Sequence, residues 1–328
     1  MLTPEEFRYM LEDTGTLELD GGLATELETR GYDLNHPLWS AKLLKDNPEA
    51  IQNVHRDYYL AGANVAITAS YQSSVDGFRA HFGMSEAESV QLIKRSVALA
   101  HSAREMAHRQ SLEFSSRVRL VAGSVGCYGA YLSDGSEYRG DYKLRTEQFK
   151  AFHRPRIRAL VEAGVDLLAL ETMPQLTEIE SLLEMLREEF AGVSAWVSCT
   201  LVDSGHISDG TCIEQVLRVV NQSQDVVVAF GVNCVPIGLV SEALRLMRRR
   251  TKLPLLCYPN SGEVFDAQTK TWSSGEDAVS DWTTLAHEWK EHGARLIGGC
   301  CRTGPKQIMA ISRALSAKTE NSSSDAQG

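Results

Sequence analysis

The chain has 328 residues, of which 43% are hydrophobic and 23% charged, and its formal net charge at pH 7 is −10. A chain of this size can bury a large core, and it carries no basic tract of the kind that binds nucleic acid or anionic membranes. No run approaches the roughly 20 apolar residues that a membrane helix needs.

The first residues, MLTPEEFRYMLEDTG, predict a helix rather than a signal peptide. They show neither a basic n-region nor an apolar h-region. Thr3 can act as the N-cap, Pro4 as the first helical residue and Glu6 as the partner that closes a capping box. Seven cysteines without an export signal favour reduced thiols and a cytoplasmic location.

Eight short apolar runs follow in chain order, and each predicts a buried strand of a parallel sheet. The runs are residues 16–22, 64–72, 117–126, 165–172, 194–200, 225–234, 252–260 and 294–301. Amphipathic stretches separate them, and these predict helices over residues 85–108, 146–163, 174–190 and 236–250. In the first of these stretches, apolar residues such as Val90, Ile93 and Val97 recur at helical spacing.

Strands that alternate with helices in this way predict an α/β fold, a (β/α)8 TIM barrel. An open, doubly wound sheet is the alternative. No G-x-G-x-x-G motif follows the first strand, which weakens a dinucleotide-binding interpretation. No linker divides the chain, so we expect a single domain over residues 1–316. Residues 317–328 are small and polar, and we expect a disordered tail.

Polar and sulfur-bearing residues gather at the predicted strand ends, where a barrel places its active site. Cys234 ends the sixth strand, and Cys300 and Cys301 end the eighth. These ends lie two strands apart around a barrel, so three thiols can meet near one point. A catalytic zinc takes three protein ligands and keeps one position open. Gly298 and Gly299 would let both adjacent thiols turn inward. On spacing alone, three ordinary buried cysteines remain the alternative.

The chain resembles the homocysteine S-methyltransferase family, the zinc-dependent barrels that methylate homocysteine. The resemblance rests on DGGLATELETRG, NHPLWSAKLL, ITASYQSS, LALETMP, FGVNC and LIGGCCRTGP, and it covers nearly the whole chain. The segments GAYLSDGSEYRGDY and YPNSGEVFD resemble the stand-alone branch that uses S-methylmethionine as methyl donor. The resemblance implies a (β/α)8 barrel in which Cys234, Cys300 and Cys301 hold zinc.

Two carboxylates at strand ends are candidates for the ammonium group of homocysteine. The resemblance implies this role for Asp20 and Glu171. The alternatives are a turn aspartate and a carboxylate that forms a salt bridge to a neighbouring loop. The backbone N–H groups of Gly21, Gly22 and Leu23 can receive the substrate carboxylate, because glycines expose backbone donors.

Other polar and aromatic residues complete the expected pocket. Ser70, Tyr71 and Gln72 end the second strand and are expected to line it. A sulfonium is a soft cation that aromatic faces attract, which makes Trp39, Tyr128 and Tyr131 candidates for the donor site. Trp39 could instead pack as an anchor at a helix start.

Two acidic residues in the loop after the third strand are further candidates. Asp134 and Glu137 could pair with the ammonium group of the donor, and a solvated loop is the alternative.

The sequence thus predicts an enzyme that transfers a methyl group from S-methylmethionine to the thiolate of homocysteine, giving methionine. S-adenosylmethionine is the alternative donor. Selenocysteine methylation by the same family and a non-catalytic zinc-binding or thiol-sensing barrel are the alternative functions. We expect Zn²⁺ as the cofactor, small-molecule substrates, no nucleic-acid or membrane partner, and a monomer.

Overall fold

Eight parallel strands form one sheet that closes on itself, which confirms the predicted (β/α)8 barrel. The computed structural model describes residues 1–110, 117–262, 264–266, 271–273 and 281–316. The strands follow the order β1-β12-β9-β8-β5-β4-β3-β2. Their bounds are Leu17–Glu18 (β1), Val65–Ile67 (β2), Leu120–Gly126 (β3), Leu167–Met173 (β4), Ala195–Cys199 (β5), Val227–Asn233 (β8), Leu255–Tyr258 (β9) and Ala294–Ile297 (β12). A parallel bridge between Leu19 and Val65 joins the two ends of this sheet.

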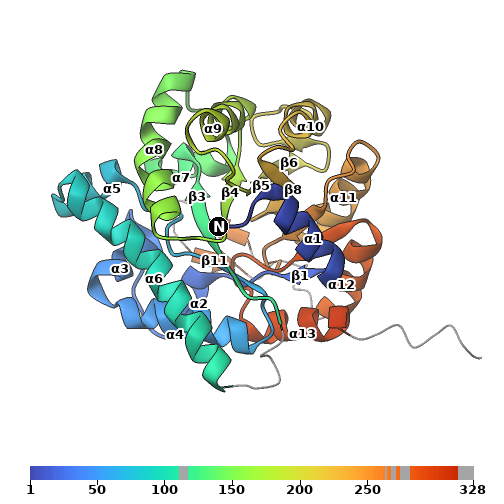
Figure 1. Cartoon of the computed structure of the whole chain (residues 1–328), viewed down its shortest axis with the longest axis horizontal. Coiled ribbons are helices and arrows are strands. Elements are labelled where there is room, and N and C mark those ends of the chain that lie inside the picture. Colours follow the sequence, from blue (N-terminus) through green and yellow to red (C-terminus); the bar gives the residue numbers. More distant parts are fainter. Residues whose placement is uncertain (111–116, 263, 267–270, 274–280, 317–328) are drawn as a thin grey trace, which may run out of the picture.

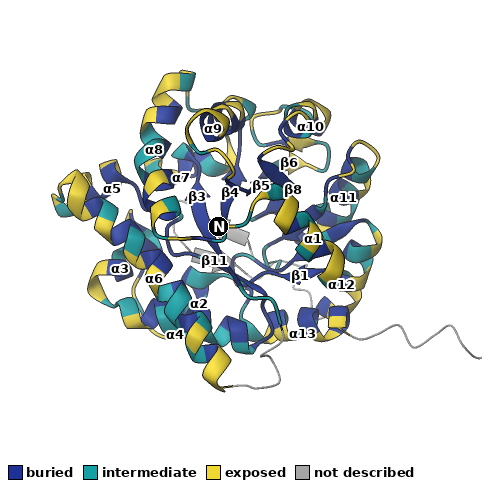
Figure 2. Cartoon of the chain, viewed as in Figure 1, coloured by how far each residue is buried: buried dark blue, intermediate teal, exposed yellow. Residues whose placement is uncertain are grey.

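Helices surround the barrel, each with one buried and one exposed face (Figures 1 and 2). They are α1 (Pro4–Thr14), α2 (Leu23–Thr29), α3 (Leu43–Asp46), α4 (Pro48–Leu60), α5 (Val75–Phe82), α6 (Glu86–Gln110), α7 (Tyr128–Leu132), α8 (Thr146–Glu162), α9 (Leu176–Glu189), α10 (Ile213–Asn221), α11 (Val240–Arg248), α12 (Trp282–Glu291) and α13 (Pro305–Ser316). Two hairpins form small sheets of their own, separate from the barrel sheet, by pairing β6 (Leu201–Asp203) with β7 (His206–Ile207) and β10 (Val264–Asp266) with β11 (Thr271–Ser273).

Helix α1 closes the end of the barrel at which the strands begin (Figure 1). Its predicted capping box is present, with the Thr3 hydroxyl accepting from the Glu6 N–H and the Glu6 carboxylate accepting from the Thr3 N–H. Phe7 and Leu11 are buried in the same apolar cluster as the side chains of the barrel interior. The opposite end, where the strands finish, is therefore the open one.

The predicted helices agree with the structure apart from their limits. The stretch expected to be helical over residues 236–250 starts with a 3-10 turn over Ile237–Leu239, and α11 begins at Val240. Pro236 precedes this turn and has an extended ψ of 135°. No helix in the described part of the chain combines the length and apolar composition that crossing a bilayer requires. The expected tail at residues 317–328 lies outside the described residues.

Candidate active site

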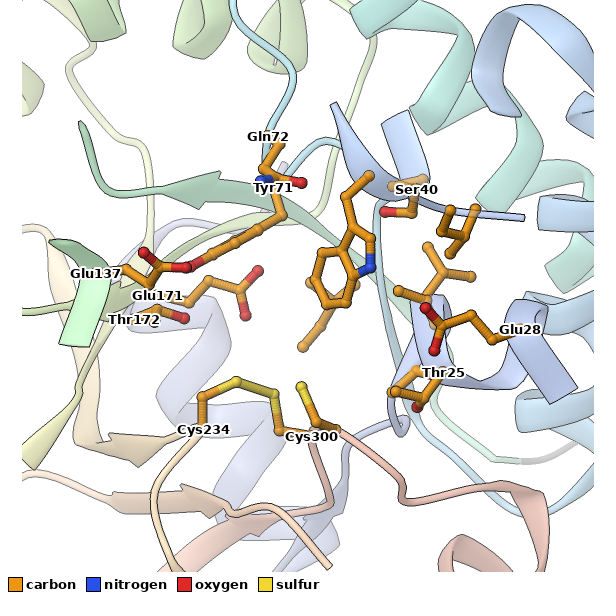
Figure 3. Close-up of a pocket in the computed structure, with 18 of the residues that line it drawn as sticks. Thr25, Glu28, Ser40, Tyr71, Gln72, Glu137, Glu171, Thr172, Cys234 and Cys300 are labelled. Carbon is orange, nitrogen blue, oxygen red and sulfur yellow. A yellow bond between two sulfur atoms is a disulfide. The ribbon is translucent and has the colours of Figure 1, made fainter. Parts of the chain in front are cut away.

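A pocket of about 410 Å³ opens at the carboxyl ends of the strands. Residues from distant parts of the chain line it, including Asp20 after β1. Glu171 on β4, Cys234 after β8 and Cys300 after β12 also line it (Figure 3). This volume suits a small-molecule ligand. The expectation that chemistry gathers at the strand ends therefore agrees with the position of the pocket.

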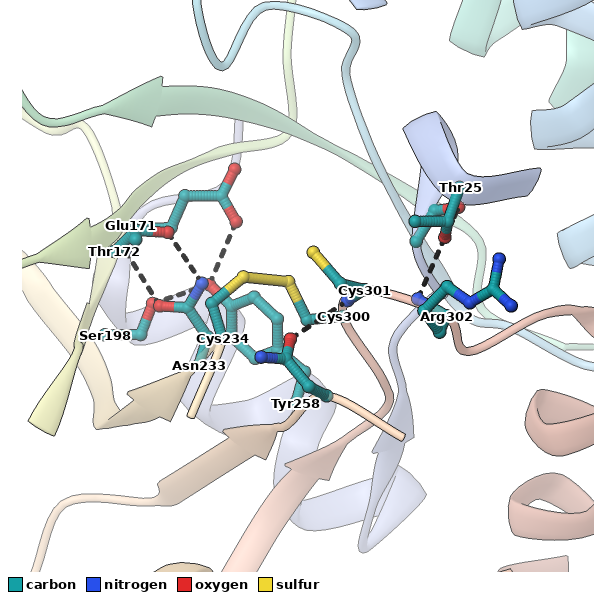
Figure 4. The surroundings of a disulfide bond; sticks show 12 residues. Thr25, Glu171, Thr172, Ser198, Asn233, Cys234, Tyr258, Cys300, Cys301 and Arg302 are labelled. Atoms are coloured by element: carbon teal, nitrogen blue, oxygen red, sulfur yellow. Dashed lines mark hydrogen bonds between the residues drawn. A yellow bond between two sulfur atoms is a disulfide. The ribbon is translucent and has the colours of Figure 1, made fainter. Parts of the chain in front are cut away.

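The three cysteines expected to bind zinc meet at one side of this pocket. The Sγ atoms of Cys234, Cys300 and Cys301 lie within 4.8 Å of one another. Cys234 and Cys300 are joined by a disulfide, with their Cα atoms 5.5 Å apart, and Cys301 is a free thiol (Figure 4). The expectation of reduced thiols therefore does not hold for this pair, because cysteines close enough to share one ion are also close enough to bond to each other.

Backbone contacts fix the two segments that carry these cysteines. The Cys300 N–H donates to the Pro259 carbonyl at 2.7 Å, and the Cys301 N–H donates to Asn260 Oδ1 at 3.2 Å. Gly22 lies directly against this turn, since a Cβ built on it would be 2.5 Å from the Cys300 carbonyl oxygen. Burial raises the pKa of the Cys301 thiol to about 12, so this sulfur stays protonated until a cation approaches it.

Asp20 is buried at the base of the pocket, with only 2% of its surface exposed. Its Oδ2 accepts a hydrogen bond from the Ile67 N–H at 2.9 Å, which fixes the carboxyl group beside β2. Burial raises the pKa of Asp20 well above its usual range, and the nearby Glu171 adds to that shift. Two acidic groups that are both desolvated favour a cationic ligand between them.

Glu171 projects from β4 into the pocket and is held from two sides. Its carboxylate accepts hydrogen bonds from the Ser124 hydroxyl and from the Tyr258 hydroxyl, the latter at 3.2 Å. The Tyr258 hydroxyl in turn lies 2.6 Å from Ser198 Oγ and 3.2 Å from Trp196 Nε1. Burial raises the pKa of Glu171 to about 7, so this carboxyl can gain or lose its proton near neutral pH.

Thr172 follows Glu171 and has a φ of 59°, a left-handed conformation that is strained for a β-branched residue. Asn233 at the end of β8 stabilises it with two hydrogen bonds of 2.8 Å (Figure 4). The Thr172 N–H donates to Asn233 Oδ1, and Asn233 Nδ2 donates to the Thr172 hydroxyl. Two other pocket residues, Trp39 and Cys234, also have positive φ values, of 44° and 50°. Such conformations concentrate at functional sites.

Several residues expected to bind substrate line the pocket, namely Asp20, Gly21, Gly22, Leu23, Trp39, Gln72 and Glu171. The structure does not bring Ser70 or Tyr131 to the pocket lining. The Ser70 hydroxyl donates to the Ser124 carbonyl, and the Tyr131 ring packs 5.4 Å from Tyr128. The Gly22 N–H donates to the Thr303 carbonyl at 2.9 Å and is thus already engaged, contrary to its expected role as a carboxylate donor.

Sequence reasoning missed the side chains that position Glu171 and Thr172. Ser124 lies inside β3, and Tyr258 and Asn233 end other strands, far from residue 171 in the chain. Asn233 and Tyr258 were recognisable as polar residues at strand ends. Only the folded barrel shows which carboxylate or backbone group each of them contacts.

Comparison with known proteins agrees with this site. The sequence matches the homocysteine S-methyltransferase family over residues 17–315. Homocysteine S-methyltransferase of Escherichia coli is 50% identical over 304 residues, covering 93% of this chain and 96% of that protein. Homocysteine S-methyltransferase YbgG of Bacillus subtilis is 45% identical over 93% of this chain and 96% of its own. Selenocysteine methyltransferase of Astragalus bisulcatus is 42% identical over 90% and 91% of the two chains.

Solved structures that resemble this chain point to the same family. The homocysteine methyltransferase MmuM from Escherichia coli, in its metallated form, superposes with a TM-score of 0.84 at 48% identity, covering 94% of this chain and 99% of that one. Its oxidized form superposes with a TM-score of 0.83 at the same identity, covering 94% and 98%. Together with the barrel, the cysteine cluster and the buried carboxylates, these matches establish that the chain belongs to the homocysteine S-methyltransferase family.

Proposed function

We propose that this protein transfers a methyl group from the sulfonium of S-methylmethionine to the sulfur of homocysteine, with methionine as the product. The observation that carries the proposal is the pocket itself. The three sulfur atoms of the cysteine cluster line the same pocket as two desolvated carboxylates, Asp20 and Glu171. An amino acid with a thiol needs both features, one for its sulfur and one for its ammonium group.

Zinc is the metal that we propose for the cysteine cluster. Three thiolates from Cys234, Cys300 and Cys301 form a soft donor set that suits this ion, and the distances among their sulfurs are compatible with one shared ion. When bound, zinc supplies a Lewis acid that lowers the pKa of a coordinated thiol. The cysteines must be reduced to bind it, which is the reason to place the working protein in the reducing cytoplasm.

Asp20 and Glu171 are proposed to hold the ammonium group of homocysteine. Both carboxyl groups are buried and have raised pKa values. A cation between them would favour their ionised forms and lower both pKa values. Ser124 and Tyr258 keep the Glu171 carboxylate aimed into the pocket by hydrogen bonds, so the substrate is oriented before reaction.

The walls of the pocket suit a cationic donor. The described residues that line it include no lysine or arginine but five acids, which are Asp20, Glu28, Asp33, Glu137 and Glu171. The aromatic rings of Trp39 and Tyr71 also line it, and aromatic faces attract soft cations. The leaving group from a sulfonium is a neutral thioether, so the residues need to align two sulfur atoms and need not donate a proton.

A competition assay tests the donor. S-methylmethionine, S-adenosylmethionine, betaine and methyltetrahydrofolate are supplied at equal concentration, each with a distinguishable methyl label, and labelled methionine is measured. We expect labelling mainly from S-methylmethionine. Labelling mainly from betaine or the folate would refute the donor assignment. Selenocysteine, offered against homocysteine as acceptor, tests the second activity found in this family.

A pair of conservative variants tests the carboxylates. Asp20→Asn and Glu171→Gln should keep zinc but raise the KM for homocysteine, since each removes a charged partner from a desolvated ammonium. The expected loss in each case is about 3 kcal/mol, typical of one broken buried pair. Wild-type kinetic constants in both variants would show that the carboxylates are structural.

We further propose that the protein acts as a monomer, because one chain supplies every element of the pocket described above. Size-exclusion chromatography with light scattering tests this.

A further inference from the structure

We propose that Glu137 binds the ammonium group of the methyl donor and so selects donors that are amino acids. This inference rests on the proposed function, because it assigns one residue to the second substrate. Glu137 lies in the 3-10 turn Ser136–Tyr138 between α7 and α8, and it lines the pocket (Figure 3).

One oxygen of this carboxylate is buried without a partner. Glu137 Oε2 is inaccessible to solvent and has no hydrogen-bond partner in the described part of the chain. Burial raises the pKa of Glu137 to about 7. The basic residue of the same loop, Arg139, pairs with Asp141 at 2.9 Å. Native structures rarely leave a buried carboxylate oxygen unbonded, so this atom calls for a ligand that can donate a hydrogen bond.

The backbone around Glu137 is anchored on both sides. The Thr200 hydroxyl, just beyond β5, donates to the Glu137 carbonyl at 2.9 Å, and the Ser208 hydroxyl donates to Thr200 Oγ1 at 2.8 Å. At the start of the turn, the Ser136 N–H donates to Asp134 Oδ1 at 2.9 Å. The backbone that carries the carboxylate is therefore fixed before a ligand arrives, which reduces the entropic cost of binding.

The direction of methyl transfer assigns Glu137 to the donor rather than to the acceptor. The acceptor sulfur belongs beside the cysteines, with its ammonium group at Asp20 and Glu171. In-line displacement places the donor sulfonium on the far side of the acceptor sulfur, so the rest of the donor extends away from the cysteines. Figure 3 shows Glu171 between the Glu137 carboxylate and the sulfurs of Cys234 and Cys300 in this view.

Tyr71 supplies a second contact in the same region. Its ring lines the pocket. Burial raises the pKa of its hydroxyl, and the nearby charges of Cys127 and Glu137 add to that rise, so the Tyr71 and Glu137 side chains lie near each other. An aromatic face for the sulfonium and a carboxylate for the ammonium match the two cationic groups of one α-amino sulfonium donor. A betaine or a sulfonium without an amino group has no N–H to donate to Glu137.

The test compares the binding of two sulfonium compounds to the zinc-loaded full chain by calorimetry. S-methylmethionine carries the ammonium group, and 3-dimethylsulfoniopropionate lacks it. Glu137→Gln should weaken binding of S-methylmethionine about 10- to 100-fold, the loss expected for a charge-assisted hydrogen bond. The same variant should bind the compound without the amino group within about 2-fold of wild type, which also shows that its pocket is folded.

Asp141→Asn is the matched control. It removes one negative charge from the same loop, but Asp141 is exposed and pairs with Arg139, so binding of both compounds should stay within about 2-fold of wild type. Equal weakening of both compounds by Glu137→Gln, an unchanged affinity for S-methylmethionine, or an equal effect of Asp141→Asn would each overturn the inference. Failure of the wild-type protein to bind S-methylmethionine would overturn it too.

Turnover separates this inference from the proposed function. If Glu137→Gln weakens the binding of S-methylmethionine but the wild-type protein methylates no homocysteine, the inference stands and the proposed function fails. If methyl transfer proceeds and Glu137→Gln leaves donor binding unchanged, the proposed function stands and the inference fails. With both correct, the variant raises the KM for the donor and leaves the KM for homocysteine unchanged.

Discussion

Replacing Asn233 by alanine should destabilise the fold and weaken binding of homocysteine together. Asn233 is fully buried and makes two hydrogen bonds of 2.8 Å with Thr172, whose φ is 59°. Each bond is worth about 1 kcal/mol, and a stranded buried N–H on Thr172 costs about 1–3 kcal/mol more. Relaxation of the strained residue returns about 1–2 kcal/mol. The expected net loss is about 1–4 kcal/mol, measured as a lower midpoint of urea denaturation at unchanged slope.

The functional part of this prediction follows from the neighbouring residue. If Thr172 leaves its left-handed conformation, Glu171 moves with it, and the KM for homocysteine should rise about 10-fold or more, as for other displaced positioning groups. Asn221→Ala is the control, because Asn221, the last residue of α10, also makes two side-chain hydrogen bonds, with Thr251 and Arg250, and does not line the pocket. An unchanged KM for homocysteine in Asn233→Ala would show that Asn233 does not position Glu171. An unchanged free energy of unfolding would show that its two hydrogen bonds to Thr172 do not stabilise the fold.

Four other predictions concern separate features of the structure. Burial raises the pKa of Glu171 to about 7, so the protonated carboxyl contributes its full stabilisation of the fold below about pH 4.5, and this contribution is lost as the pH rises through 7. Glu171→Gln should therefore flatten the decline of the urea midpoint between pH 5 and 8. An unchanged profile would contradict this reasoning. Phe7→Ala should cost about 3–5 kcal/mol of stability with kinetic constants retained at low temperature, since Phe7 is fully buried at the closed end of the barrel. Cys301→Ser should lose zinc in metal analysis, while Cys199→Ser, at a buried cysteine outside the cluster, should retain it; full zinc content in both would refute the ligand assignment. Gly22→Ala should also lower zinc content, because its Cβ would meet the Cys300 carbonyl, and normal zinc affinity in this variant would show that the turn can move at little cost.

The sequence was most informative where a local pattern decides the structure. Parallel strands buried on both faces produce nearly continuous apolar runs, so all eight barrel strands were predicted. Barrel geometry then brings the ends of two strands together, and this is why Cys234, Cys300 and Cys301 were expected to meet. Both inferences depend on short-range composition and on the rules of one fold class.

The sequence was least informative about which way individual side chains point. Ser70 and Tyr71 are adjacent, but only Tyr71 lines the pocket, because the Ser70 hydroxyl bonds to the backbone of β3. Tyr131 is on the short helix α7, and its ring packs against Tyr128 and Phe152. The orientation of such a helix depends on its packing against α8, which no periodicity in five residues can encode.

Closure of the barrel has a consequence for how the protein is made. Strand β1 pairs with β12, which lies far along the chain, so one of its two neighbours in the sheet emerges from the ribosome long after β1 itself. Pairing of such distant segments is slow because a long loop must close first. Asp20 follows β1 and Cys300 follows β12, so the pocket cannot be complete until this last seam has formed. Zinc uptake or methyl transfer during refolding would therefore report the closure of this seam, and the nascent chain would remain inactive until β12 and the cysteines after it had left the ribosome.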